Sequence, residues 1–160
     1  MVEKNLIDAL RLNVPVLRGF VAAIPEAELT RRRRPEFWTI HEHLGHLVVT
    51  QVMLCRRIEL FIKEERPVIV PYVPEDRPKP ESSAAKSGRE LVEGFARWRE
   101  KQLGLLESCP PGTWAKTAEH PEYLSYGFEI LVRHILLHDC YHMNRIEELW
   151  LLKDEFIKNW

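Results

Sequence analysis

The chain of 160 residues lacks several features that would assign it quickly to a class of protein. It contains only three cysteines, Cys55, Cys109 and Cys140, and none belongs to a C-x-x-C pair. An odd, scattered set argues against a disulfide framework and fits a reducing, cytoplasmic compartment. The formal net charge is −1. Without an excess of positive charge, neither a nucleic-acid partner nor an acidic membrane surface is expected.

Long apolar runs are also lacking. The longest uncharged stretch, LGHLVVTQVMLC, is too short to span a bilayer. The opening residues, MVEKNLIDAL, carry charges at positions 3, 4 and 8 and therefore lack the apolar core of a secretory signal. Neither a membrane span nor an export signal is predicted from this sequence.

Strand patterns are nearly absent, and only residues 68–73 show a brief β-branched alternation. Apolar residues recur instead with helical spacing. This spacing predicts four helices, at about 3–22, 40–63, 84–108 and 125–152.

Local signals refine the expected helices. Pro15 should kink the first helix or mark a restart. Thr39, followed three residues later by Glu42, has the pattern of a capping box at the start of the second helix. Ser125 is the candidate cap of the fourth.

A proline-rich segment, ERPVIVPYVPEDRPKPESS, separates the second and third helices, with five prolines in residues 66–83. Such a segment is a connection rather than a helix, and it is long enough to cross from one end of a bundle to the other. The sequence therefore predicts one all-α domain over residues 1–160. Its expected architecture is a four-helix bundle with a long crossover loop between helices 2 and 3.

Histidine is the residue type whose clustering calls for explanation. In HILLHDCYH, His142 falls at the centre of the apolar stripe, His138 about 40° to one side and His134 about 80° away, at its edge. His138 and His142 can share one ion, as two histidines one turn apart do in the H-E-x-x-H helix. His134 lies about 12 Å along the axis from His142, too far to join that ion. Hydrogen-bonded core histidines are the alternative interpretation.

The sequence leaves open the role of Asp139 and the choice of a third ligand on the second helix. Asp139 points near the core, where it would either orient a ligand imidazole or bond to loop backbone. In WTIHEHLGHL, His43 flanks the main apolar stripe and His46 lies on a second, less apolar one. Periodicity slightly favours His43 as a third ligand. His41 is expected near the helix start, facing solvent.

The two histidine segments together resemble the DinB/YfiT-like superfamily of small metal-binding four-helix bundles. That family has a tryptophan and Ser/Thr opening the second helix, a ligand histidine eight positions after the tryptophan, and H-x-x-x-H on the last helix. Here Trp38 plus eight is His46, and HDCYH supplies His138 and His142. The resemblance implies that these three histidines, rather than His43, hold a divalent ion. Zinc or nickel is expected first, and iron or manganese is also compatible.

The resemblance also implies an activity. Three imidazole ligands leave open positions for water or substrate, as in catalytic zinc sites, and a bound water or thiol becomes acidic there. We therefore expect a metal-dependent enzyme acting on a small molecule, either a hydrolase or an S-transferase using a low-molecular-weight thiol. Family members often form homodimers. Where relatives read closer to HLGQI, this chain has Met143–Ile146 (MNRI), which bears on the substrate side.

The sequence leaves two other classes of function to compare with an enzyme. A non-catalytic, stress-related scaffold stiffened by its metal is the alternative function. A di-iron carboxylate or haemerythrin-like oxygen site fits poorly, because ferritin-like bundles need two Glu-x-x-His helices and the sequence has no suitable one. Glu42 and His43 are possible general bases without further support.

Several further residues are expected to have structural roles. Arg31–Arg34 are expected to be a solvated basic run, with an anionic substrate as the alternative partner of one of them. Cys140 faces away from the expected site. Four of the five tryptophans are expected to be packing residues, with Trp114 also a candidate pocket residue; these four are Trp38, Trp98, Trp114 and Trp150.

Overall fold

The computed structural model describes residues 2–71 and 86–157. Short helices accompany four long ones, and the described residues form no strand beyond two isolated bridges. The predicted all-α architecture is confirmed. The long helices are α1 (Val2–Ala22), α3 (Ile40–Lys63), α4 (Gly88–Ser108) and α5 (Phe128–Leu151). The short ones are α2 (Glu26–Leu29), η3 (Pro111–Ala115) and η4 (Asp154–Phe156).

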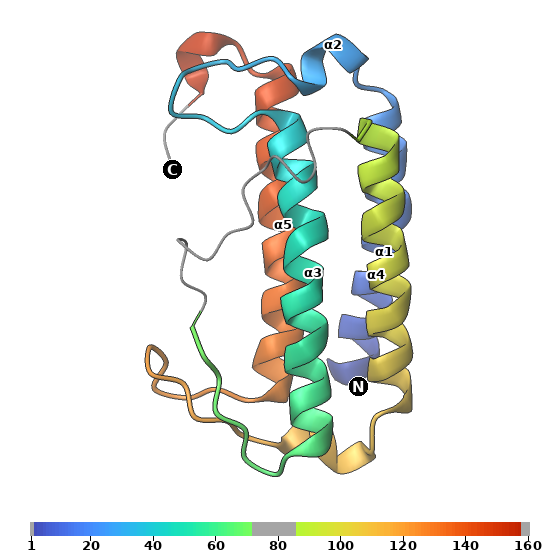
Figure 1. Cartoon of the computed structure of the whole chain (residues 1–160), viewed down its shortest axis with the longest axis vertical. Coiled ribbons are helices and arrows are strands. Elements are labelled where there is room, and N and C mark those ends of the chain that lie inside the picture. The colour runs from blue at the N-terminus through green and yellow to red at the C-terminus, as the bar shows by residue number, and fades with distance from the viewer. Residues whose placement is uncertain (1, 72–85, 158–160) are drawn as a thin grey trace.

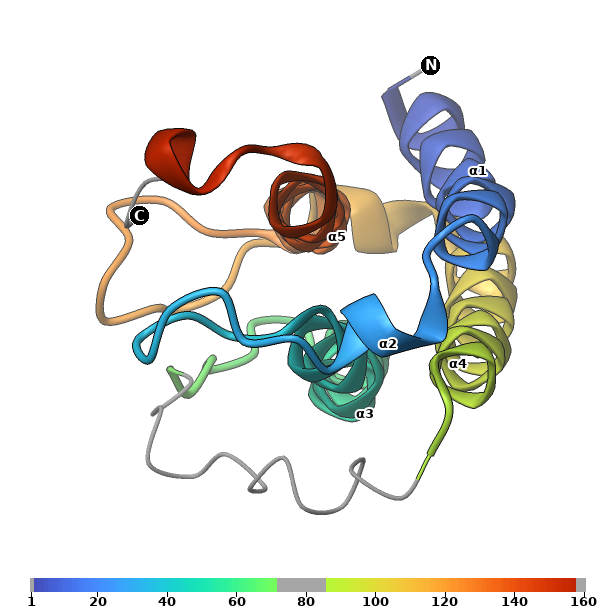
Figure 2. The same cartoon turned by 90° about the horizontal axis from the view of Figure 1, so that it is seen from above.

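The long helices form a bundle in which α1 and α5 run one way and α3 and α4 the other (Figure 1). Seen along the bundle, they occupy four corners, and the contacts link α1 to α4, α4 to α3, α3 to α5 and α5 to α1 (Figure 2). Because α3 and α4 are parallel, the chain must return along the bundle between them. This is the predicted crossover, although its residues 72–85 lie outside the described part.

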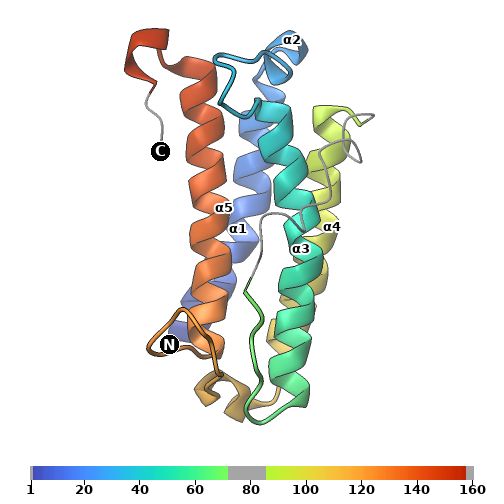
Figure 3. The same ribbon diagram turned by 60° about the vertical axis from the view of Figure 1, so that its left-hand side comes forward.

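The remaining connections lie at opposite ends of the bundle, the one carrying α2 at one end and residues 109–127 at the other (Figure 3). The second connection is held by backbone hydrogen bonds, including Phe128 N to Lys116 O at 3.1 Å. Of the candidate strand at 68–73, Val68 forms a single parallel bridge with Glu119, and residues 72 and 73 are not described.

Of the three local helix signals expected from the sequence, the capping box is observed, whereas the cap at Ser125 and the restart at Pro15 are not. Thr39 and Glu42 form the predicted capping box, with the Thr39 hydroxyl accepting from Glu42 N at 3.1 Å. Ser125 is not a cap, because backbone bonds hold the chain extended as far as Gly127, the observed N-cap. Of the kink or restart predicted at Pro15, the restart is wrong. Helix α1 continues through this exposed position, where water can solvate the carbonyl that proline leaves without a donor.

The apolar core is divided into two clusters. One contains Leu17, Leu47, Phe95 and Ile146; the other contains Leu10, Leu54, Leu106 and Ile135. On each long helix a buried polar residue lies between the two clusters, and these four are Asn13, Gln51, Arg99 and Asp139. A polar layer therefore crosses the middle of the bundle, and the histidines lie beside it. None of the described helices is long and apolar enough to cross a bilayer.

Candidate metal centre

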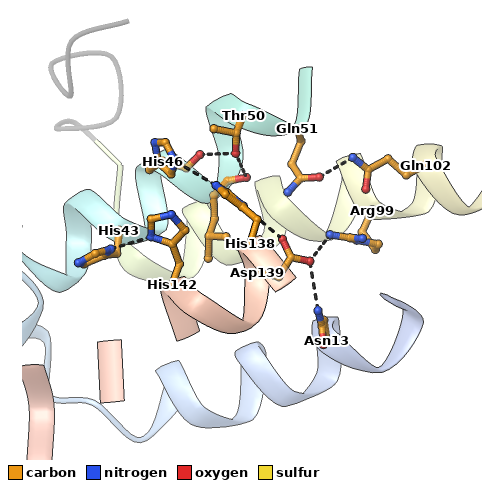
Figure 4. Close-up of polar contacts among 11 residues, drawn as sticks. Asn13, His43, His46, Thr50, Gln51, Arg99, Gln102, His138, Asp139 and His142 are labelled. Atoms are coloured by element: carbon orange, nitrogen blue, oxygen red, sulfur yellow. Dashed lines mark hydrogen bonds and ion pairs between the residues drawn. The ribbon is translucent and has the colours of Figure 1, made fainter. Parts of the chain in front are cut away.

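Three histidines from two helices meet beside the polar layer (Figure 4). His46 comes from α3, and His138 and His142 come from α5, one turn apart. One ligand nitrogen from each lies within 4.8 Å of the other two. His46 Nε2 faces His138 Nε2 at 3.1 Å. The structure thus brings together the three residues that the resemblance selected.

His43 contacts the same cluster through His142. Its Nδ1 lies 2.8 Å from Nδ1 of His142, and its ring is buried. Burial, assisted by the Arg145 guanidinium, lowers the pKa of His43 to about 4. A neutral His43 can accept a hydrogen bond from the Nδ1–H of His142, which would leave His142 Nε2 available as a ligand.

The donor set fits a divalent ion. Ligand nitrogens about 2.1 Å from a tetrahedral ion are separated by about 3.4 Å, close to the observed 3.1 Å between His46 and His138. Three neutral imidazoles suit zinc, nickel or iron, and their number leaves coordination positions open. The arrangement is therefore that of a candidate metal centre accessible to a further ligand.

Asp139 lies next to this centre and is fully buried. Its Oδ2 accepts hydrogen bonds from Asn13 Nδ2 at 3.1 Å and from the Arg99 guanidinium. Its Oδ1 lies 3.9 Å from His138 Nδ1, so a small ring rotation would bring the imidazole N–H onto the carboxylate and direct Nε2 to the ion. Of the two interpretations left open for Asp139, this geometry favours orientation of the ligand. The Asp139 carboxylate bonds to side chains of α1 and α4, rather than to loop backbone as in the other interpretation.

A cavity of about 540 Å³ contains the histidines and continues along the groove between α3 and α5. Trp38 covers one side of the cluster, with ring centroids 5.1 Å from His46 and 6.1 Å from His142. The interpretation of Trp38 as a packing residue is therefore incomplete, because it also forms a wall of the site. Arg57 and Tyr126 line the cavity as well. Sequence reasoning missed both, since only the pairing of helices places them there.

Other candidate residues lie elsewhere. His134 lines the cavity but packs against Tyr123 and Tyr126, outside the histidine cluster. His41 is half-buried rather than exposed and approaches Lys86 O at 2.6 Å. Trp114 packs edge-on against Phe128 and does not line this cavity. Cys140 is exposed, as expected.

The basic run at 31–34 is neither merely solvated nor part of the cavity wall. Its side chains connect the loop before α3 to nearby elements. Arg31 pairs with Glu28, Arg32 with Glu42, Arg33 with the Asp154 carboxylate, and Arg34 with the Asp154 backbone oxygen. None of the four lines the cavity, so the alternative in which one of them faces a substrate gains no support from this geometry. Each guanidinium finds its partner within the fold.

Comparison with known proteins agrees with this picture. A family model described as the DinB superfamily matches residues 9–146. A solved structure, YfiT from Bacillus subtilis, described as a probable metal-dependent hydrolase with an unusual four-helix bundle topology, is similar with a TM-score of 0.79. The two share 20% sequence identity, and the match covers 92% of this chain and 85% of the other. No curated protein matches significantly in sequence.

Proposed function

The chain belongs to the DinB superfamily, and from this membership and the histidine cluster we propose that it is a metal-dependent enzyme acting on a small molecule. His46, His138 and His142 hold the divalent ion, with zinc or nickel the expected metal. The observation that carries the proposal is the convergence of their three nitrogens within 4.8 Å in the wall of a cavity. A volume of about 540 Å³ suits a small substrate.

The bound ion would supply Lewis acidity, which lowers the pKa of a water or thiol beside it. The protein residues prepare the site. His43 contacts Nδ1 of His142, Asp139 lies 3.9 Å from His138 Nδ1 where it can orient that ring, and Trp38 shields one side of the cluster from solvent.

Neither general base considered from the sequence is favoured. The Glu42 carboxylate is engaged by Thr39 and Arg32, while His43 is buried against His142. We propose hydrolysis or transfer to a small thiol as the reaction class.

Metal analysis of purified variants tests the centre. We expect about one ion per wild-type chain, and loss of that ion in His46→Ala and His138→Ala. His134→Ala is the matched control, because His134 lies in the same cavity one turn from His138 but outside the cluster. Retention of stoichiometric metal by His46→Ala would overturn the assignment.

A scaffold remains the second candidate, because the three ligands join α3 to α5 and an ion there would stiffen the bundle. Turnover assays separate the two functions. The metal-loaded protein would be given simple esters and amides, and electrophiles with a panel of small thiols. Turnover that disappears in His138→Ala supports the enzyme, whereas metal-dependent thermal stabilisation without any turnover supports the scaffold.

A further inference from the structure

The cavity extends well beyond the histidine cluster. Past His138 it is lined on α5 by His134 and Leu131, and on α3 by Met53 and Leu54. Leu131, Met53 and Leu54 give this part of the cavity an apolar wall beyond the cluster. A substrate that reacts at the histidines has room for a tail in this part of the cavity.

One positive charge stands at the far end. Arg57 lines the cavity about three helical turns after His46. The side chains of a helix lean toward its N-terminus, which is the end of α3 that carries His46, and the Arg57 guanidinium belongs to the cavity lining. Its Nη2 donates to Val70 O at 2.7 Å, which holds the group in place and leaves further N–H donors for a ligand.

The charge balance of the cavity favours an anion at this end. The lining includes three charged residues, Glu36, Arg57 and Arg145. Arg145 pairs with Glu148 at 2.5 Å, and Glu36 lies before the start of α3, at the other end from Arg57. Among the described residues, Arg57 has no carboxylate partner.

Two neutral groups accompany Arg57. Tyr126 and His134 both line this end, and their rings lie 5.7 Å apart. Burial raises the pKa of Tyr126 and lowers that of His134, so near neutral pH the hydroxyl keeps its proton and the imidazole is uncharged. Both can donate a hydrogen bond to an oxyanion without adding a second charge.

We propose that Arg57 and Tyr126 form a subsite for a carboxylate on the substrate, at the other end of the cavity from the three-histidine centre. A single unpaired cation matches a single negative charge, and the planar guanidinium matches a carboxylate in shape. The substrate is thus a small molecule with its reacting group at one end, an apolar middle and a carboxylate at the other end. This proposal rests on the proposed function, because the metal supplies the first anchor.

Chain-length-matched thiols test the subsite, since a thiolate binds the ion and its tail then enters the cavity. The cobalt-substituted protein would be titrated with 6-mercaptohexanoate and with 6-mercaptohexanol, following the cobalt–thiolate absorption. We expect the acid to bind at least about 10-fold more tightly than the alcohol, the effect of one charge-assisted contact. The shorter pair, 3-mercaptopropionate and 3-mercaptopropanol, should show a smaller preference because the carboxylate falls short of Arg57.

Arg57→Gln should reduce the preference for 6-mercaptohexanoate to within about 3-fold, with cobalt content unchanged. Arg56→Gln is the matched control, since Arg56 is exposed on the same helix and does not line the cavity. Equal binding of acid and alcohol by a wild-type protein that holds cobalt would overturn the subsite alone. Failure of the wild type to bind cobalt would overturn the proposed function, and the subsite with it.

Discussion

His43 and His46 lie one turn apart on α3 and reach different parts of the same centre. Periodicity favoured His43 because it flanks the apolar stripe, whereas the family resemblance selected His46. In the structure, His46 Nε2 faces Nε2 of His138, while His43 Nδ1 contacts Nδ1 of His142. Both residues therefore contribute to the site, one as a proposed ligand and one as the support of a ligand.

This division predicts the effect of His43→Ala. Loss of the partner that holds a ligand imidazole typically weakens metal binding by about 10- to 100-fold, and we expect a decrease of that size with one ion still bound at saturation. Competition with a chromophoric chelator measures the affinity. His41→Ala is the control, since His41 contacts Lys86 O away from the cluster. If both variants bind zinc equally well, His43 does not support His142.

At the scale of an element, the start of α3 determines the positions of the site residues Trp38, His43 and His46. Trp38 and Thr39 precede the helix, and His43 and His46 follow within its first two turns. The capping box fixes the first turn, and Arg32 bonds to the Glu42 carboxylate at 2.6 Å. The loop that carries Trp38 is thereby held to the helix that carries His46.

Glu42→Gln tests this element through its pH dependence. Burial opposes ionisation of Glu42, but hydrogen bonds from Arg32 and from the Thr39 backbone outweigh it and hold the pKa below 4.5. Because the pKa is lower in the folded state, the ionised group stabilises the fold above about pH 4.5, and this stabilisation is lost as the pH falls through the folded-state value. We expect Glu42→Gln to cost about 0.5–1 kcal/mol at pH 7, the usual effect of a capping contact.

Urea unfolding at pH 7, 5, 4 and 3 measures this contribution. The difference between Glu42→Gln and the wild type should shrink as the pH falls below 4.5. The exposed Glu100→Gln serves as the control for a general charge effect on a helix. A difference that stays constant across the series would show that ionised Glu42 does not stabilise the start of α3.

At the scale of the whole molecule, the polar layer connects all four long helices, because Gln51 on α3 accepts a hydrogen bond from Gln102 on α4 at 2.6 Å and the other three are joined through Asp139. Arg99 on α4 and Asp139 on α5 form an ion pair in which both side chains are fully buried, and Asn13 on α1 donates to the same carboxylate. The hydrophobic cluster on each side keeps water from this pair. The layer therefore sets the relative positions of the helices on which the histidines depend.

Removing one member of the pair should be costly. Arg99→Met leaves the Asp139 carboxylate buried without its cation, and we expect the free energy of unfolding to fall by about 3–5 kcal/mol. The double variant Arg99→Met/Asp139→Leu should recover much of that loss, because no uncompensated charge remains. Urea unfolding measures both, with the exposed Arg97→Met as control. A loss in Arg99→Met no larger than in the control would contradict this account.

Assembly also belongs to this scale. The homodimer implied by the family resemblance stays a prediction, as does the cytoplasmic location, and sedimentation equilibrium of the metal-loaded chain would measure the oligomeric state. The proposed subsite lies in a cavity formed by one chain. Binding of a carboxylate to this subsite is therefore expected whether the chain is a monomer or a dimer.

The sequence by itself determined the features that depend on one helix at a time. Apolar spacing predicted the bounds of α3 as observed, and it placed His138 and His142 on the inward face of α5 with Cys140 outside. The capping box of Thr39 was also readable, because its two residues are neighbours in the chain. Such features need only the helical repeat and local hydrogen bonding.

Only the tertiary structure decided the contacts between helices. It paired Asp139 with Arg99 and Asn13, gave His43 its place behind His142, and brought Arg57 into the cavity that contains the histidines. These outcomes depend on how far each helix is rotated and shifted against its neighbours. That rotation and shift follow from packing the four apolar faces together, which no single helix specifies.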